Sequence, residues 1–174
     1  MEYPELYTEY ASLLEDKTSL QKRLAMLKDG YISVKTISGK KYTYLQYRIN
    51  GKLTGEYVRE DNLPEVRAEL DERAGILGKI RDIDGRLKNI EAAAGILSEN
   101  LRRKLVMLRR CAAMEMLPPE ERLKSLAFGS AMAALEGIPV SEETDKNLSR
   151  WANGDLSFQE SYINTLRTYH LPGV

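Results

Sequence analysis

The fold of this chain is decided by residues 61–116, which read DNLPEVRAELDERAGILGKIRDIDGRLKNIEAAAGILSENLRRKLVMLRRCAAMEM. Apolar residues recur here at spacings of three and four, the pattern of a helix with one buried face. This apolar row consists of Leu63, Val66, Leu70, Leu77, Ile80, Leu87, Ile90, Ala94, Leu97, Leu101, Leu105 and Leu108. A continuous helix would be roughly 80 Å long. Its buried face therefore needs a partner helix, a second copy of the chain or a break.

Glycines inside this stretch indicate where a break could fall. Each costs about 1 kcal/mol relative to alanine in a helix interior. They are Gly75, Gly78, Gly85 and Gly95. We expect a bend or a close helix contact near one of them, and the pattern leaves open whether 61–116 is one continuous helix.

An earlier segment supplies a natural partner. Residues 4–28 repeat the same apolar spacing, and Asp29-Gly30 ends the predicted helix because glycine adopts the left-handed cap conformation readily. We therefore predict a long antiparallel helical hairpin, similar to a coiled coil. The first helix is too short to cover residues 89–113, so that segment could form a homodimer.

Between the two predicted helices, residues 31–59 have the signals of a β insert. Alternating strands are separated by Ser38-Gly39 and by Asn50-Gly51, and Asn-Gly is typical of a type I′ hairpin turn. A two-residue turn places Arg48 opposite Leu53, and Tyr44 opposite Tyr57. The sequence thus predicts a three-stranded antiparallel meander at the tip of the hairpin.

A second unit is expected after Leu117-Pro118-Pro119, because proline ends the long helix. Three short helices follow, with Ser141 as one N-cap and Ser157 with Glu160 as a capping box. The first of them has an expected inward stripe of Leu123, Leu126, Ala127, Ala131, Ala134 and Leu135. The predicted fold class is mainly α with a small β insert. The predicted domains are 1–117, with the insert at 31–59, and 118–174.

Composition gives little support for an enzyme. The 26 basic and 26 acidic side chains balance, and Cys111 is the single cysteine, so the sequence offers no disulfide framework or cysteine-based zinc site. The one histidine, His170, cannot build a Ser-His-acid set convincingly, and no phosphate-binding glycine loop is present. No apolar run approaches the length of a membrane span. We expect a cytoplasmic, non-enzymatic protein without a metal or cofactor.

The β insert has a basic and aromatic composition. It contains five of the ten tyrosines and the cations Lys35, Lys40, Lys41, Arg48, Lys52 and Arg59 against one Glu. Such a mixture can bind nucleic acid through phosphates and stacked bases, with Lys40, Lys41, Arg48 and Lys52 as candidate contacts. The alternative is structural, because tyrosine suits strands and lysine protects exposed sheet edges.

Glu136 breaks a local rule. It lies in the last turn of a predicted helix, just before Gly137, where the helix dipole favours a cation and disfavours an acid. Broken local rules are more frequent at functional sites than elsewhere. The competing explanation is an ordinary exposed glutamate at a helix end.

Residues 121–168 resemble the small prokaryotic three-helix antitoxins of the VbhA type, which inhibit Fic-domain toxins. The resemblance lies in Ala133-Ala134-Leu135-Glu136-Gly137, Pro139 to Arg150 and Gly154-Asp155-Leu156-Ser157. It implies that Glu136 enters the active site of a separate Fic-domain AMP-transferase and pairs with an arginine of its catalytic loop. The carboxylate would then occupy the place of the ATP γ-phosphate. Met132 stands where that family carries Ser or Thr.

The sequence therefore predicts an antitoxin-like inhibitor of a toxin–antitoxin system, with Glu136 and Gly137 as the inhibitory motif. Two other functions stay open. One is a nucleic-acid-binding regulator that uses the basic hairpin. The other is a structural adaptor that dimerises through residues 89–113.

Overall fold

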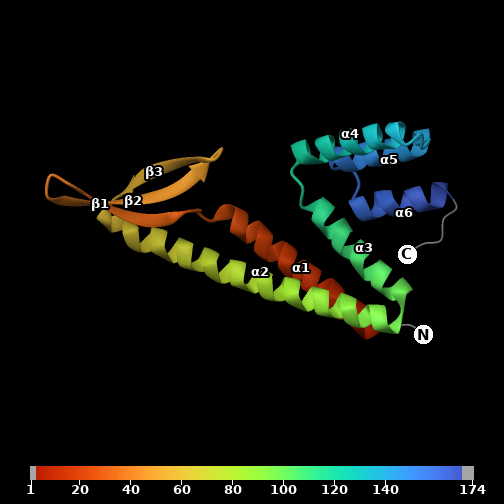
Figure 1. Ribbon diagram of the computed structural model, residues 1–174, viewed down its shortest axis with the longest axis horizontal. Coiled ribbons are helices and arrows are strands. Elements are labelled where there is room, and N and C mark those ends of the chain that lie inside the picture. The colour runs from red at the N-terminus through yellow and green to blue at the C-terminus, as the bar shows by residue number, and fades with distance from the viewer. Residues whose placement is uncertain (1–2, 170–174) are drawn as a thin grey trace. The chain divides into compact units, whose positions relative to one another are not determined.

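The computed structural model describes residues 3–169, in which six α-helices accompany one three-stranded antiparallel sheet (Figure 1). This confirms a mainly helical fold with a small β insert. The elements are α1 (Pro4–Met26), β1 (Tyr31–Ile37), β2 (Lys40–Ile49), β3 (Lys52–Val58), the 3-10 turn η1 (Glu60–Asn62), α2 (Leu63–Leu97), α3 (Glu99–Glu115), α4 (Pro119–Leu135), α5 (Glu142–Asn153) and α6 (Phe158–Thr168). None of the helices described is both long and apolar enough to cross a bilayer.

The chain divides into two compact units. One comprises residues 15–86, and the other comprises residues 1–14 together with 87–174. The predicted domain boundary at 117/118 stays a prediction.

The sheet in the 15–86 unit has the order β1-β2-β3 and the predicted register. Arg48 pairs with Leu53, and Tyr44 pairs with Tyr57. Asn50 and Gly51 have φ angles of 49° and 79°, as a type I′ turn requires. The register fixes the face on which every strand residue lies, because successive side chains alternate between faces.

One face of the sheet covers the start of α2. Leu45 and Val58 from the sheet and Val66 from α2 form a buried cluster. Half-buried Ile32, Tyr47, Leu63 and Leu70 surround it. Apolar packing against one helix therefore leaves the opposite sheet face open.

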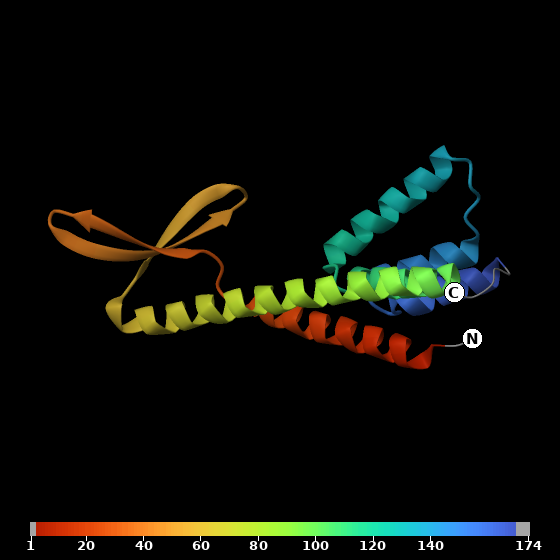
Figure 2. The ribbon, with the colours of Figure 1, turned by 60° about the horizontal axis from the view of Figure 1, so that its bottom comes forward.

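Helices α1 and α2 run side by side within this unit (Figure 2). Ion pairs connect them. Lys17 Nζ lies 2.6 Å from Asp84 Oδ1, and Arg23 Nε lies 2.7 Å from Glu72 Oε1. Lys17 interrupts the apolar row of α1, and its half-buried position is explained by this pair.

The long apolar stretch breaks at Ser98. Its hydroxyl accepts the backbone N–H of Leu101, which makes Ser98 the N-cap of α3. Gly95 lies one turn earlier, and a Cβ added there would meet Arg102 Cδ at 3.0 Å. Gly75, Gly78 and Gly85 lie inside α2 without a close neighbour at the Cβ position. Thus the break falls near one predicted glycine and not near the others.

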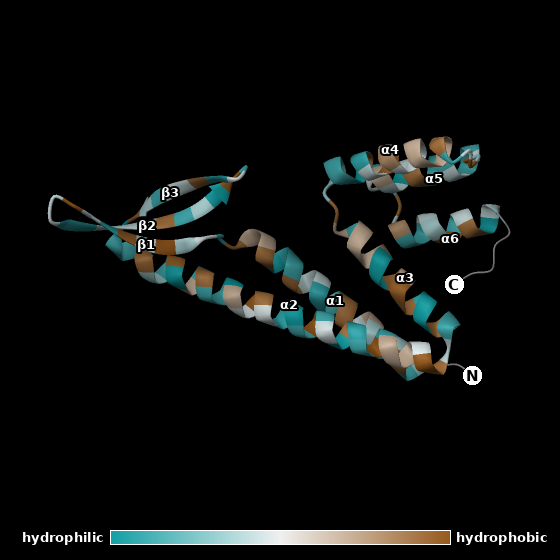
Figure 3. Ribbon diagram, viewed as in Figure 1, coloured by the Kyte–Doolittle hydropathy of each residue, from teal (hydrophilic) through white to brown (hydrophobic). Residues whose placement is uncertain are grey.

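The second unit covers much of the segment that lacked a partner. Leu105 of α3 is fully buried, as are Leu87 and Ala94 of α2 and Tyr10 of α1. Burial, followed by a hydrogen bond from the Tyr10 hydroxyl to Glu91, raises the pKa of that phenol. Hydrophilic and hydrophobic residues alternate along α2 and α3 (Figure 3).

Helices α5 and α6 begin where the sequence predicts. Ser141 caps α5, and Ser157 and Glu160 form a complete capping box at α6. The expected inward stripe on α4 is wrong, because no residue of that helix is buried; Leu123 and Leu135 are 52% and 81% exposed. A side of α4 that includes half-buried Arg122 and Leu126 faces its neighbours instead.

Candidate functional site

Glu136 and Gly137 lie at the carboxyl end of α4. Gly137 has a φ of 65°, and its N–H donates to Ala134 O while the N–H of Ile138 donates to Ala133 O. These two bonds define a Schellman motif, in which glycine at the left-handed position ends the helix. Gly137 therefore has a structural role, whatever Glu136 does.

The Glu136 carboxylate faces solvent. The residue is exposed, and among residues 3–169 its side chain has no hydrogen-bond or ion-pair partner. An acid at the negative end of a helix dipole, without a local cation, is slightly unfavourable to folding. A cation from another molecule would find this carboxylate available.

An apolar surface accompanies Glu136 on α4. Phe128 is 69% exposed, Met132 is 38% exposed and Leu135 is 81% exposed. Their spacing of three and four places them on one side of the helix. We call these three residues the α4 surface. Exposed large apolar side chains gathered on one side are typical of protein-binding surfaces.

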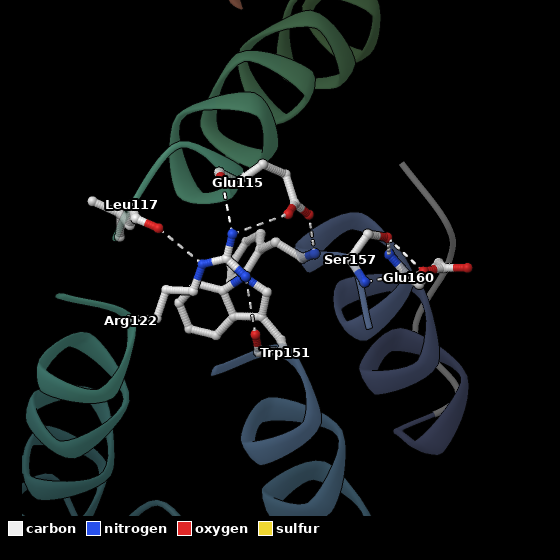
Figure 4. Close-up of polar contacts among 7 residues, drawn as sticks. Glu115, Leu117, Arg122, Trp151, Ser157 and Glu160 are labelled. Carbon is white, nitrogen blue, oxygen red and sulfur yellow. Dashed lines mark hydrogen bonds and ion pairs between the residues drawn. The ribbon is translucent and has the colours of Figure 1, made fainter. Parts of the chain in front are cut away.

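Arg122 fixes the start of α4 to its neighbours (Figure 4). Its guanidinium donates to the carbonyl oxygens of Glu115 at 2.8 Å, Leu117 at 3.0 Å and Trp151 at 3.3 Å. Those carbonyls lie at the carboxyl ends of α3 and α5, where helices leave acceptors without an intrahelical i+4 partner, and the Trp151 carbonyl also accepts the N–H of Gly154 at 2.9 Å. Arg122 therefore caps two helices and places its positive charge at their negative ends.

Glu115 and Trp151 also join the helix ends that meet at Arg122. The Glu115 carboxylate accepts the backbone N–H of Phe158, the first residue of α6, where an acid is favoured. Trp151 is 1% exposed, and its ring meets Phe158 edge to face at 4.9 Å between centroids. The four helix ends are thus joined mainly by polar groups around one indole (Figure 4).

The segment after Gly137 is also held. The Tyr169 hydroxyl accepts the backbone N–H of Ser141 at 2.9 Å and donates to Pro139 O at 3.3 Å. Accepting the Ser141 N–H favours the phenolate, so the pKa of Tyr169 is lowered. These contacts fix the loop next to Glu136 and would limit how far it moves on binding.

The structure separates the predicted nucleic-acid contacts. Lys40 and Arg48 occupy one face of the sheet, and Lys41 and Lys52 occupy the face that also contains buried Leu45. Arg48 Nη1 also donates to Gly51 O at 3.0 Å within its own turn. The four cations therefore do not form one group.

Other chemistry has little support in the described residues. No group of three or more His, Cys, Asp or Glu within 3–169 could hold a metal ion. Cys111 is buried, and burial raises the pKa of its thiol, so it is a poor nucleophile. His170 lies outside the described residues.

Sequence reasoning missed two residues, one that anchors α4 and one that lies over a tyrosine ring of the sheet. Arg122 was not singled out, although a basic residue just after Leu117-Pro118-Pro119 is well placed to cap the preceding helix. Lys35 was counted among the cations of the insert, but its position 5.1 Å from the Tyr44 ring centroid needed the strand register.

A family model described as a domain of unknown function, DUF6788, matches residues 3–68. The matched segment comprises α1, the three strands and the first residues of α2. No curated protein and no solved structure matches the chain.

Proposed function

We propose that the protein inhibits a separate Fic-domain AMP-transferase by inserting Glu136 against the position of the ATP γ-phosphate. The observation that carries the proposal is the exposed, unpartnered carboxylate at the end of a helix whose accompanying α4 surface is apolar and exposed. In this proposal the protein acts by binding and not by catalysis.

The chemistry follows from charge and geometry. A carboxylate resembles a phosphate oxygen toward a guanidinium, and the pair can form two parallel hydrogen bonds. In the absence of a cation of its own, Glu136 gives up no internal bond when it pairs with an arginine of the partner. The α4 surface would supply apolar contact area beside this charged contact.

Met132 is a point of difference from the antitoxins that the C-terminal segment resembles. It lies one turn before Glu136, and its carbonyl accepts the Glu136 N–H at 3.0 Å. A serine there would place a hydroxyl on the same side of the helix as the carboxylate.

For the rest of the chain, we propose the antiparallel helical hairpin with the β meander at its tip. The ion pairs Lys17–Asp84 and Arg23–Glu72 support it. The later residue of α1 pairs with the earlier residue of α2, as expected for antiparallel helices. A homodimer through residues 89–113 also stays a proposal. Leu97 is 50% exposed there, whereas Leu105 is covered within its own unit. Light scattering would test it.

The direct experiment is an AMP-transfer assay. A Fic-domain AMP-transferase whose antitoxin is a separate chain would be mixed with labelled ATP, its protein target and the full-length chain. We expect wild type to suppress transfer and Glu136→Gln to restore it by at least tenfold, because the amide keeps the size and removes the charge. Glu120→Gln, at the other end of α4 and also exposed, is the matched control and should still inhibit.

The α4 surface gives a second readout. Phe128→Asp should weaken the complex in calorimetry without changing the helical circular dichroism, because the ring contacts solvent in the free protein. Equal inhibition by wild type and Glu136→Gln would remove the proposed role of the carboxylate. Unchanged binding of Phe128→Asp would remove the proposed docking surface.

A further inference from the structure

We propose that the open face of the sheet binds single-stranded nucleic acid, with tyrosines stacking on bases and Lys35, Lys40 and Arg48 contacting phosphates. This inference is independent of the inhibitor proposal, because it concerns another surface. It rests on how the strand register sorts side chains between the two faces.

Four tyrosines gather on one side of the sheet, which we call the aromatic face. They are Tyr31, Tyr42, Tyr44 and Tyr57. The Tyr57 ring lies 6.1 Å from Tyr42 and 5.9 Å from Tyr44, both edge to face. Tyr57 is 51% exposed and Tyr31 is 54% exposed, so their rings have free surface. Tyr47, the fifth tyrosine of the insert, packs against the buried cluster instead.

The same face has a single sign of charge. Lys35, Lys40 and Arg48 lie on it, and Lys35 sits over the Tyr44 ring. Every strand residue of this face is described, and none is acidic; Glu56, the one acid of the strands, points to the other face. Cations next to exposed aromatic rings match a ligand that alternates phosphate charge with flat bases.

Gly55 leaves the middle of the aromatic face open. It lies opposite Gln46, and a Cβ placed there would come no closer than 4.0 Å to Gln46 or Tyr44. The site would therefore accept a larger residue without a clash. Nothing in the packing requires glycine at this position, whereas a base approaching the Tyr44 and Tyr57 rings would benefit from the space.

A single strand fits these features better than a duplex. Stacking on tyrosine requires bases whose faces are free, and paired bases in a duplex present only their edges. The face is built from strands and presents no helix to enter a major groove. Strands of seven to ten residues span roughly 20–30 Å, enough for several nucleotides.

The test is fluorescence anisotropy of the full-length chain with labelled oligonucleotides of about 12 nucleotides. The probes are oligo-dT, oligo-U and a duplex of the same length, each titrated at two salt concentrations. We expect both single strands to bind better than the duplex, with affinity that falls as salt rises. Stronger binding of oligo-U than oligo-dT would assign the site to RNA, and the reverse to DNA.

Matched variants locate the surface. Lys35→Ala with Lys40→Ala should weaken binding by about tenfold or more, while Lys41→Ala with Lys52→Ala removes the same charge from the other face and should change it little. Tyr57→Ala should cost about tenfold through lost stacking, and Gly55→Val should block the face while keeping the strand. Circular dichroism melts check that every variant is folded.

Three results would overturn the inference. They are absence of binding to both single strands at low salt, equal binding of duplex and single strands, and equal loss for the two lysine pairs. An unaltered affinity in Tyr57→Ala and Gly55→Val would likewise show that the tyrosines serve only the sheet.

Discussion

The β-sheet and helix α4 are held in place by opposite means. The sheet packs one face against Val66 through Leu45 and Val58, and all three residues are nearly inaccessible. Helix α4 has no buried residue, and its start is held by the polar bonds of Arg122 to three carbonyls. Apolar burial of a sheet face needs only alternating apolar and polar residues along each strand. The hydrogen bonds of Arg122 need donors and acceptors from distant parts of the chain.

This difference bears on function. A sheet fixed by one face leaves the other face free for a ligand. Helix α4 leaves Glu136 and the α4 surface exposed to a partner. In both regions the exposed surface is the side that folding does not use.

The largest expected effect comes from truncating Trp151, around which the ends of the C-terminal helices meet. Trp151→Ala should lower the free energy of unfolding by about 3–5 kcal/mol, because the indole is nearly inaccessible and packs on Phe158. Phe128→Ala, an exposed aromatic in α4, should cost under about 0.5 kcal/mol. Urea denaturation followed by circular dichroism measures both. Similar costs would mean that α4 is packed more tightly than described.

Truncating the apolar cluster tests the other side of the comparison. Leu45→Ala should cost about 2–5 kcal/mol, since it leaves a cavity between the sheet and α2. Leu53→Ala, in the same sheet but 53% exposed, should have a small effect. The same denaturation experiment applies, and a larger loss for Leu53 would show that the aromatic face is covered.

Two glycines should respond with opposite signs. Gly137→Ala forces alanine into the left-handed conformation and should cost about 1–2 kcal/mol. Gly78→Ala, inside α2 with open space at its Cβ, should raise the free energy of unfolding by about 0.5–1 kcal/mol. Thermal melts of both variants give the comparison. Stabilisation by Gly137→Ala would contradict the Schellman motif.

The smallest effect concerns Glu99 in the first turn of α3. Hydrogen bonds from Arg102 hold the pKa of Glu99 at about 2, below its usual range. A lowered carboxyl pKa adds stability above the unfolded value near ~4.3, and this contribution disappears as the pH falls toward 2. Glu99→Gln should therefore melt slightly below wild type at pH 7 and level with it at pH 2. A constant offset would exclude the ion pair as its cause.

Features set by neighbouring residues could be predicted from the sequence. Asn50-Gly51 determines its turn and register, and Ser157 with Glu160 determines the start of α6, because the interacting groups lie within four residues. The inward side of α4 could not be predicted, since its anchor is the charged Arg122, bonded to a carbonyl 29 residues away. The break at Ser98 was signalled by a serine followed by Glu99, but the apolar row obscured it.

The candidate sites divide along the same line. Glu136 was identified as an unfavourable charge at a helix end, and the residue is exposed there. The group Lys40, Lys41, Arg48 and Lys52 was assembled from composition, which ignores the alternation of strand faces. Assigning each cation to a face of the sheet requires the strand register. This assignment replaces Lys41 and Lys52 with Lys35 among the candidate nucleic-acid contacts.

The most direct test of the inhibitor account is a double-mutant cycle on the binding free energy of the complex. Glu136→Gln in this chain would be combined with Arg→Gln at the catalytic-loop arginine of the Fic-domain enzyme, and calorimetry would measure all four affinities. The account predicts a coupling energy of about 1.5 kcal/mol or more between the two positions. Additive losses, with no coupling, would contradict the pairing of Glu136 with that arginine.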